Sequence, residues 1–225
     1  MISAVQAVEK RLNYQFRDPQ LLECALTHRS AGKRNNERLE FLGDSILNLV
    51  IAEFLFRHLA DAPEGDLSRM RASLVKGEKL AKLATGLELG EYLVLGSGEL
   101  KSGGFRRSSI LADSLEAIFG AIFMDAGFET CQRIILEIYA ATLDDLPDVS
   151  SIKDPKTKLQ EFLQSRQLPL PEYAVLSVEG EPHAQKFVVE CRVSGMTESV
   201  LGNGSSRKKA EQSAAKKALQ ELLHD

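Results

Sequence analysis

The chain has 225 residues, of which 44% are hydrophobic and 27% are charged, with a formal net charge of −4. This composition is typical of a globular protein of one or two domains. It contains no apolar run long enough to span a membrane and no N-terminal secretory signal. Its three cysteines are too far apart for a zinc module, and they indicate a reducing compartment such as the cytoplasm. These features exclude a membrane-spanning or disulfide-rich secreted protein.

The first 144 residues have a helical pattern almost throughout, because apolar residues recur there at helical spacing. The pattern predicts helices over residues 3–13, 19–28, 37–58, 67–75, 77–88, 109–125 and 128–144. Asn36 and Asp66 have side chains of the type that caps a helix, and they predict the starts of the third and fourth helices. The glycines of residues 96–104 predict a loop.

Three carboxylates share one face of the helix predicted over residues 37–58. Glu37, Glu40 and Asp44 are spaced i, i+3 and i+7, which places them within roughly 60° of each other around the helix axis. The opposite face carries the apolar residues Leu39, Leu42, Ile46 and Val50. Because like charges at this spacing destabilise a helix by about a few tenths of a kcal/mol per pair, we expect something to compensate for them. The candidates are a hard divalent cation and simple solvation of an exposed acidic face.

A second acidic pair, Asp113 and Glu116, interrupts an otherwise apolar stretch over residues 110–124 that has the pattern of a core helix. Two carboxylates in such a helix are costly unless they are paired or bound to a metal. Arg106 and Arg107 lie just upstream and offer a salt bridge as the alternative. If the two acidic helices pack together, four or five carboxylates converge. That arrangement suits Mg²⁺ and metal-assisted phosphodiester hydrolysis.

The pattern changes near residue 150. Acids, serines and prolines cluster over residues 144–155 without apolar periodicity, which predicts a linker. The remainder predicts a helix, three strands and a helix, over residues 156–167, 173–178, 187–193, 198–202 and 207–223. The net charge is −5 over residues 1–150 and +1 over residues 151–225. Affinity for nucleic acid would therefore depend on local patches.

One such patch lies at the start of the last predicted helix, where Arg207, Lys208 and Lys209 crowd the first turn. The dipole and free N–H groups of a helix start favour phosphate, whereas cations there oppose the dipole unless an anion is nearby. Lys216 and Lys217 either extend the patch or form a solvated face. The pattern indicates phosphate binding at this helix start.

Residues 37–45, Glu-Arg-Leu-Glu-Phe-Leu-Gly-Asp-Ser, resemble the signature motif of the ribonuclease III family residue for residue. Residues 26–30 and 111–117 are similar to its flanking motifs. The helix, three strands and helix, with residues 202–210 opening the last helix, resemble a double-stranded-RNA-binding domain. The resemblance covers essentially the whole chain. It implies an all-helical endonuclease domain over residues 1–147, a linker over 148–153 and an α-β-β-β-α double-stranded-RNA-binding domain over 154–225.

The activity that this resemblance implies is Mg²⁺-dependent cleavage of double-stranded RNA, with Mn²⁺ as a substitute, leaving 5′-phosphate and 3′-hydroxyl ends. It implies a cytoplasmic homodimer, joined through the helical domain, in which each subunit cuts one strand. Phe41 and Gly43 are the residues expected at the dimer contact, although Phe41 could instead pack under a neighbouring loop. The expected substrates are ribosomal RNA precursors and some messenger RNAs.

The resemblance also assigns roles to the acidic residues. It implies that Glu40, Asp113 and Glu116 are metal ligands and that Asp44 and Glu116 are catalytic. Asp44 would either orient the attacking water or hold the outer shell of a metal ion. Glu37 and Glu64 are auxiliary acids in this interpretation, and Glu64 could equally be an ordinary loop residue. A lone histidine before an arginine, His28, is expected to form hydrogen bonds rather than to act as a general base.

For the C-terminal part, the resemblance implies that Gln160, Gln164 and His183 reach the minor groove of the duplex and that the cations at 207–209 bind phosphates. One position departs from the pattern, since Glu211 stands where such domains often have lysine. Two other functions stay open at this point. One is a double-stranded-RNA-binding protein without catalysis, and the other is a structural dimer whose acidic cleft binds a basic partner.

Overall fold

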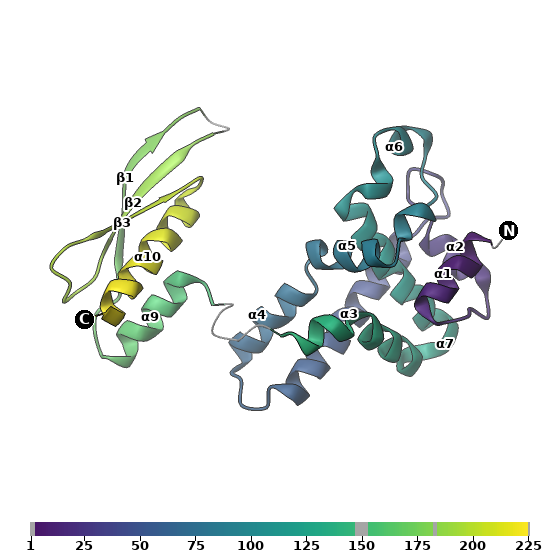
Figure 1. The fold of residues 1–225 in the computed structure, drawn as a ribbon, viewed down its shortest axis with the longest axis horizontal. Coiled ribbons are helices and arrows are strands. Elements are labelled where there is room, and N and C mark those ends of the chain that lie inside the picture. The colour runs from purple at the N-terminus through teal and green to yellow at the C-terminus, as the bar shows by residue number, and fades with distance from the viewer. Residues whose placement is uncertain (1–2, 147–152, 182–183, 225) are drawn as a thin grey trace. The chain divides into compact units, whose positions relative to one another are not determined.

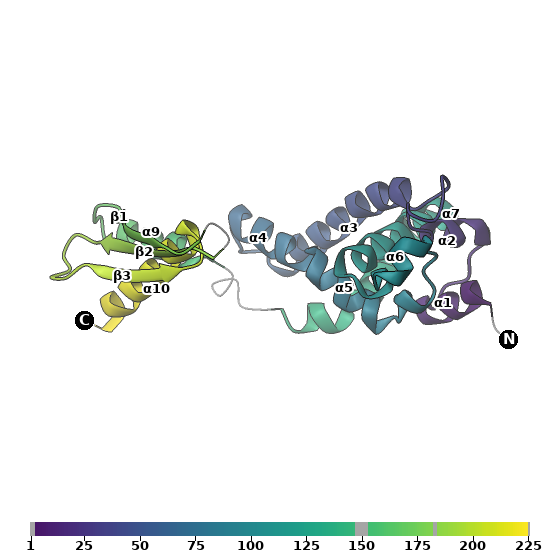
Figure 2. The same ribbon diagram turned by 90° about the horizontal axis from the view of Figure 1, so that it is seen from above.

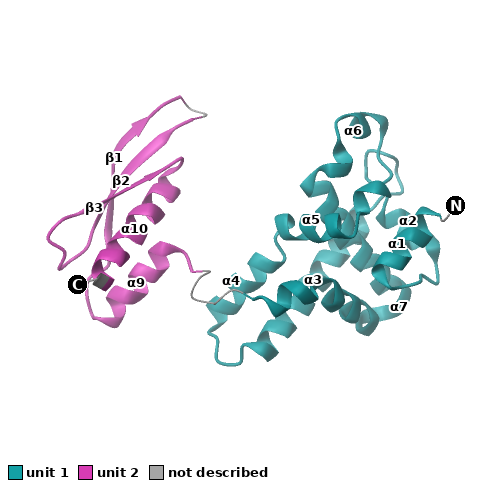
Figure 3. Ribbon diagram, viewed as in Figure 1, with its two compact units in different colours: residues 1–149 teal, residues 150–225 magenta. Residues whose placement is uncertain are grey.

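The computed structural model describes residues 3–146, 153–181 and 184–224, and these residues divide between two compact units, 1–149 and 150–225 (Figure 3). The first unit is helical and the second combines helices with a sheet, as the sequence predicts. The predicted linker over residues 148–153 lies outside the described residues apart from Lys153. Each unit is described below by itself.

Helices dominate the described part of the first unit, and loops join them (Figure 1). They are α1 (Ala4–Leu12), α2 (Pro19–Ala25), α3 (Glu37–His58), α4 (Glu64–Leu74), α5 (Gly77–Gly86), η1 (Leu89–Glu91), α6 (Ser97–Lys101), η2 (Gly104–Arg106) and α7 (Ser108–Asp144). The sequence pattern missed α6 and the two short 3₁₀ turns, which lie in and around the predicted loop over 96–104 and are too short to show apolar periodicity. Among the described residues, no helix combines the length and the apolar character needed to cross a membrane.

The starts of α3 and α4 differ in detail from the sequence prediction. Asn36 precedes α3, but its side chain makes no capping bond. The Oδ1 of Asn35 accepts a hydrogen bond from the N–H of Glu37 instead, at 3.1 Å. The prediction that Asp66 caps α4 is wrong, because α4 begins two residues earlier, at Glu64. Asp66 lies buried in the first turn, where it pairs with Arg69.

The core of the first unit is formed where α3 packs against α7. The side chains of these two helices with almost no exposure include Leu47, Val50, Ile51 and Leu55 from α3 and Leu115, Ile118, Phe119 and Ile122 from α7. The apolar face predicted for residues 37–58 is therefore confirmed at its C-terminal end, whereas Leu39 and Leu42 are half-buried. Burial of these side chains drives the association of the two helices.

Two glycines let the backbones of α3 and α7 approach closely. A Cβ atom on Gly43 would lie 1.8 Å from the carbonyl oxygen of Glu116, and one on Gly120 would lie 2.2 Å from the carbonyl oxygen of Leu39. Such distances are far inside van der Waals contact, so any side chain at these positions would push the helices apart. The contact places the acidic part of α3 directly against the acidic part of α7.

Helix α7 is broken once along its length. Gly127 has φ 80° and ψ −178°, and this non-helical residue separates two helical segments. The break falls between the helices predicted over 109–125 and 128–144. A positive φ costs little only for glycine, which explains the residue type at this position.

The second unit is a three-stranded antiparallel sheet and two helices, as far as the described residues show. Its elements are α9 (Pro155–Ser165), β1 (Glu172–Glu179), β2 (Lys186–Arg192), β3 (Val200–Gly204) and α10 (Arg207–His224). The strand order is β1-β2-β3, with Val189 of β2 opposite both Val175 and Gly202. Helix α10 runs alongside the sheet (Figure 2) and shares a core with α9, in which Leu159 and Leu163 meet Cys191, Val200, Ala214 and Ala218.

Small residues set the distance between β3 and α10. A Cβ atom on Gly202 would lie 2.2 Å from the backbone nitrogen of Ala214, and one on Gly204 would lie 2.4 Å from that of Ala210. The strand therefore lies against the backbone of the helix, which fixes the first turns of α10 relative to the sheet.

Replacing Gly43 by alanine tests the helix contact that the first unit depends on. Gly43→Ala should lower the free energy of unfolding by about 1 to 3 kcal/mol, because the added methyl group overpacks the contact with α7. Gly86→Ala is the control, since a Cβ atom at Gly86 has nothing within 4 Å, and the better helix propensity of alanine should stabilise by up to about 1 kcal/mol. Chemical denaturation measures both. Equal stabilities for the two variants would contradict the close approach of α3 and α7.

Candidate active site

The close contact between α3 and α7 brings together acids that are far apart in the sequence. Carboxylate oxygens of Glu40, Asp113 and Glu116 all lie within 4.8 Å of one another. Glu40 comes from the first turn of α3, and the other two lie one turn apart near the start of α7. Three convergent carboxylates supply the oxygen ligands that hard divalent cations prefer.

Beside these acids, the surface is hollowed into a polar cavity of about 440 Å³. Side chains from the loop before α3, from α3 itself and from α7 contribute to its lining, and they include His28, Arg29, Asn36, Glu37, Glu40 and Asp113. The sequence motif over 26–30 and the signature motif over 37–45 therefore meet in one place.

All three acids have a raised pKa. Burial is the largest cause for each, and it raises the pKa of Glu116 to about 8 with help from Asp44, Asp113 and Glu40. Burial and the neighbouring Asp113 raise the pKa of Glu40. Burial also raises the pKa of Asp113, although His28 and Arg29 oppose this effect. The metal-free cluster is thus unfavourable in its fully ionised form, and a divalent cation would relieve the repulsion.

Nearby arginines do not form ion pairs with the cluster in the described residues. Arg107 pairs with Glu99 at 2.5 Å, and the guanidinium of Arg106 lies over the ring of Phe105, 5.0 Å from its centroid. Arg29 pairs with Glu37 at 3.7 Å. The salt-bridge alternative for Asp113 and Glu116 is therefore wrong, and their charges are left for another partner.

Asn36 supplies an observation that points to a polar occupant of the cavity. Its side chain is only 2% exposed, and its Nδ2 has no hydrogen-bond partner among the described residues. A buried donor without a partner is costly, and a water molecule or an anionic oxygen would satisfy it. Together with the carboxylate oxygens, this donor fits a polar site that could hold a hydrated divalent metal ion.

Asp44 and Glu64 have different positions relative to the cluster. Asp44 is exposed on α3 near Glu116, and its Oδ1 accepts a hydrogen bond from the Nδ2 of Asn48 at 2.9 Å. Glu64 lies in the first turn of α4, where its Oε1 accepts a hydrogen bond from Ser68 at 2.6 Å. It borders a separate hollow between α3 and α4, so a single chain does not bring it to the other acids.

His28 is held in a network that connects the 26–30 motif to the following loop. Its Nδ1 accepts a hydrogen bond from the backbone N–H of Ser30 at 3.2 Å and lies 2.8 Å from the Oγ of the same residue. That Oγ accepts a hydrogen bond from the N–H of Gly96 at 2.9 Å. His28 therefore forms hydrogen bonds, as the sequence predicts.

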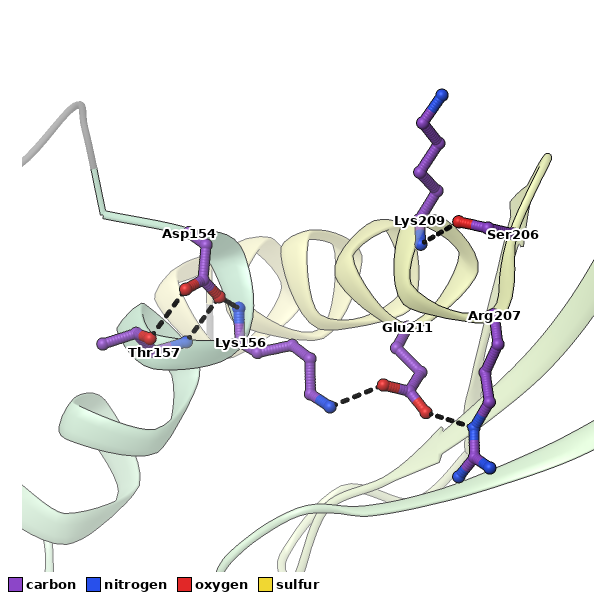
Figure 4. A network of polar contacts seen from close by, with 7 residues as sticks. All are labelled: Asp154, Lys156, Thr157, Ser206, Arg207, Lys209 and Glu211. Atoms are coloured by element: carbon purple, nitrogen blue, oxygen red, sulfur yellow. Dashed lines mark hydrogen bonds and ion pairs between the residues drawn. The ribbon is translucent and has the colours of Figure 1, made fainter. Parts of the chain in front are cut away.

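The residues predicted to bind RNA lie on the surface of the second unit. Gln160 and Gln164 are exposed one turn apart on α9. The cations Arg207, Lys208 and Lys209 are exposed at the start of α10, and Ser206 accepts a hydrogen bond from the N–H of Lys209 (Figure 4). His183 lies outside the described residues. Lys217 donates to the carbonyl of Leu201 at 2.7 Å, so its ammonium is engaged within the unit.

The sequence analysis missed the helix cap formed by Asp154 and the burial of Asn36, although the cap has a recognisable sequence signal. Asp154 caps α9 through the N–H groups of Lys156 and Thr157, with Pro155 at the first helical position. The Asp-Pro pair is a recognisable helix start. No local sequence pattern predicts that Asn36 is buried, because its burial depends on the contact between distant segments.

Family models match both units. The model described as Ribonuclease-III-like matches residues 18–143, which is more than half of the chain, and the model described as double-stranded RNA binding motif matches residues 155–222. The chain belongs to the ribonuclease III family. It is 57% identical over 219 residues to Ribonuclease 3 of Hahella chejuensis, with 97% of each chain covered. It is 55% identical over 222 residues to Ribonuclease 3 of Vibrio atlanticus, with 99% of each covered.

A solved structure supports the same assignment. The nuclease domain of ribonuclease III from Campylobacter jejuni is 47% identical, with a TM-score of 0.60, and the match covers 61% of this chain and 96% of that one. The chain is therefore an endoribonuclease, a hydrolase that acts on double-stranded RNA. Ribonuclease III family membership implies the use of a divalent metal ion, and the cluster of Glu40, Asp113 and Glu116 fits such an ion.

The raised pKa of Glu116 predicts a pH-dependent stability in the metal-free protein. The folded pKa of about 8 lies above the ordinary value of 4.5, so the folded state retains a proton that the unfolded chain releases. This contribution to stability is fully present below pH 4.5 and is lost as the pH rises through about 8. Glu116→Gln cannot ionise. We therefore expect it to be more stable than the natural protein above pH 8 and equally stable below pH 4.5.

Thermal unfolding with a chelator present, followed across this pH range for both proteins, measures the difference. Glu129→Gln is the control, because Glu129 is an exposed carboxylate on the same helix. A constant difference between the Glu116→Gln variant and the natural protein at all pH values would show that folding does not raise the pKa of Glu116.

Proposed function

We propose that this ribonuclease III family member is a Mg²⁺-dependent endonuclease that leaves 5′-phosphate and 3′-hydroxyl ends on double-stranded RNA, with Mn²⁺ as a possible substitute. The observation that carries the proposal is the convergence of Glu40, Asp113 and Glu116 from two helices. No ion pair neutralises any of the three within the described residues. Oxygen ligands in this number are typical of a Mg²⁺ site that retains several waters.

Each acid has a proposed role. Glu40, Asp113 and Glu116 are the metal ligands, and Glu116 gives up its proton when the metal binds, since its pKa is about 8 without one. A bound Mg²⁺ ion would lower the pKa of water and neutralise charge that develops on the phosphate. Asp44 and Glu116 are the catalytic residues. The Oδ2 of Asp44 makes no hydrogen bond among the described residues, and we propose that it accepts one from the attacking water.

Glu37 and Glu64 are proposed as auxiliary acids. Glu37 lines the cavity and holds Arg29 at 3.7 Å, so it tunes the charge around Glu40 rather than replacing it as a ligand. Glu64 is exposed, and it reaches the reaction only if an assembly with a second chain brings it there.

The second unit is proposed to hold the duplex. Arg207, Lys208 and Lys209 bind phosphates at the start of α10, where the helix dipole adds to their attraction. Gln160 and Gln164, together with His183, contact the minor groove. Phosphate contacts carry no sequence information, so this unit supplies affinity rather than choice of cleavage site.

A homodimer through the helical unit is also part of the proposal. Phe41 is 78% exposed, Leu49 is 56% exposed and Phe56 is 73% exposed, and the three lie along one side of α3. An apolar stripe of this kind marks an interaction surface. The nuclease domain of the Campylobacter jejuni ribonuclease III has a region involved in dimer formation. We propose that Phe41 lies at the corresponding contact here, whereas Gly43, which the sequence also suggested for it, is buried against α7 of its own chain.

The proposed setting is the processing of ribosomal RNA precursors and some messenger RNAs in the cytoplasm. The proposed domains are the nuclease over residues 1–147, a linker over 148–153 and the RNA-binding domain over 154–225. The two compact units, 1–149 and 150–225, support this division.

Removing one metal ligand should separate catalysis from binding. Glu116→Gln should reduce cleavage of a long RNA duplex in Mg²⁺ by about two orders of magnitude or more, because metal activation supplies much of the rate. Binding of the duplex without metal should change little, since the cations of α10 are intact. A gel-based cleavage assay and a binding titration measure the two effects, with Glu129→Gln as the control. Cleavage at the natural rate would contradict the site assignment and favour a binding or structural role.

Removing two cations from α10 should change the salt dependence of binding. Arg207→Ala combined with Lys208→Ala should weaken binding to all duplex sequences alike, because the lost contacts are to phosphates. The slope of log K against log salt should become shallower by about 1 to 2. Arg192→Ala, which removes an exposed cation on β2, is the control. An unchanged slope in the double variant would mean that these residues form a solvated face.

Placing a charge on the apolar stripe of α3 should disrupt the dimer. Phe41→Glu should shift the full-length protein toward the monomer in sedimentation experiments, because a buried unpaired carboxylate opposes association. Leu100→Glu is the matched control, since Leu100 is a 54% exposed apolar residue on α6. A natural protein that sediments as a monomer, or a Phe41→Glu variant that remains dimeric, would remove this contact from the proposal.

A further inference from the structure

Glu211 is the position at which the sequence departs from the pattern of its domain, and the structure shows what its carboxylate contacts. The side chain is only 12% exposed and lies between two cations (Figure 4). Its Oε1 accepts a hydrogen bond from the Nε of Arg207 at 2.8 Å, and its Oε2 accepts one from the Nζ of Lys156 at 2.6 Å. The carboxylate therefore connects the first turns of α9 and α10.

The bond to Arg207 leaves most of the guanidinium available. Only the Nε–H is used, and neither terminal nitrogen donates a hydrogen bond to any described residue. Both terminal nitrogens point away from Glu211 (Figure 4), and the side chain of Arg207 is 65% exposed. Two terminal nitrogens in a fixed plane match the spacing of phosphate oxygens, so this orientation suits a bidentate phosphate contact.

The bond to Lys156 anchors Glu211 from the other side. The ammonium of Lys156 lies 4.3 Å from the centroid of the Tyr173 ring, which holds it against β1. The backbone N–H of Lys156 is bonded to the capping carboxylate of Asp154. Lys156 is thus fixed at both ends, and it restrains the carboxylate that in turn restrains Arg207.

Glu211 is ionised in this arrangement. Burial acts to raise its pKa, but the hydrogen bonds from Lys156 and Arg207 outweigh burial and lower the pKa below its ordinary value. The trio of Lys156, Glu211 and Arg207 has a net charge of +1, so the carboxylate does not cancel the attraction for RNA.

We propose that Glu211 is a positioning residue that holds the guanidinium of Arg207 in the orientation that binds an RNA phosphate. This inference rests on the proposed role of Arg207 in duplex binding. Without the carboxylate, the long arginine side chain must be ordered when RNA binds. The entropy of ordering one such side chain corresponds to a roughly twofold to tenfold weaker affinity.

The sign of the effect distinguishes positioning from simple electrostatics. Electrostatics alone predicts that removal of a carboxylate near a polyanion strengthens binding. Positioning predicts that Glu211→Gln weakens binding by about twofold to tenfold. The salt slope should stay that of the natural protein, because Arg207 still contacts a phosphate. Glu221→Gln, which removes an exposed carboxylate from the same helix, should bind as the natural protein does or slightly more tightly.

The experiment is a double-mutant cycle on the full-length protein. Glu211→Gln, Arg207→Ala and the double variant are titrated, in the presence of a chelator, with an RNA duplex longer than the roughly 16 base pairs that one such domain spans. Circular dichroism and thermal unfolding confirm that each variant folds. If Glu211 acts through Arg207, Glu211→Gln should cause no further loss of affinity in the Arg207→Ala background.

Each outcome separates the inference from the proposed function. Unchanged binding by Arg207→Ala would overturn the role of Arg207 and, with it, the inference. Weaker binding by Arg207→Ala together with unchanged or tighter binding by Glu211→Gln would overturn the inference alone. An equal loss from Glu211→Gln in both backgrounds would also overturn it, because Glu211 would then act independently of Arg207.

If Glu211→Gln does not fold, Arg207→Lys gives the decisive measurement. Lysine keeps the charge. Its single ammonium, however, cannot donate a hydrogen bond to Glu211 and at the same time present two coplanar nitrogens to a phosphate, as a guanidinium does. The proposal expects an affinity about twofold to tenfold weaker at an unchanged salt slope. Binding equal to that of the natural protein would overturn the proposal.

Discussion

The close approach of α3 and α7 is the constraint on which the nuclease unit depends. Gly43 and Gly120 each lie against a backbone carbonyl of the opposite helix, so the two backbones meet without an intervening side chain. Apolar burial along the rest of the contact holds the helices in this register. The arrangement brings Glu40 to Asp113 and Glu116 although more than 70 residues separate them in the chain.

The same contact brings carboxylates close enough to repel one another, which favours the binding of a cation. Burial raises the pKa of all three carboxylates, and neighbouring acids add to this effect at Glu40 and Glu116, so that Glu116 in the metal-free protein has a pKa of about 8. The nearby arginines are engaged elsewhere, Arg107 with Glu99 and Arg29 with Glu37. An uncompensated acidic cluster destabilises the metal-free fold, and we expect the binding of a cation to restore that stability. This is why the geometry favours a metal site over a structural salt-bridge network.

The RNA-binding unit has the opposite requirement, because it must present exposed cations to an anionic ligand. Arg207 stands at a helix start, where its positive charge opposes the helix dipole unless an anion lies nearby. Glu211 and Lys156 connect that helix start to α9, and Gly202 and Gly204 fix it against β3. In both units, glycines allow close backbone contacts, and these contacts place charged side chains at a defined position.

The sequence by itself determined the helical and mixed classes of the two units, the division between the helices over 109–125 and 128–144, and the acids of the signature motif, because periodicity and motif spacing are local properties. It did not determine that Asp66 lies inside α4, that the arginines at 106 and 107 leave the acids unpaired, or that Asn36 is buried. Nor did it show that Glu211 lies between two cations, since it indicated at that position only a departure from the pattern of the domain. Those features depend on which distant segments meet, and only the tertiary packing decides that.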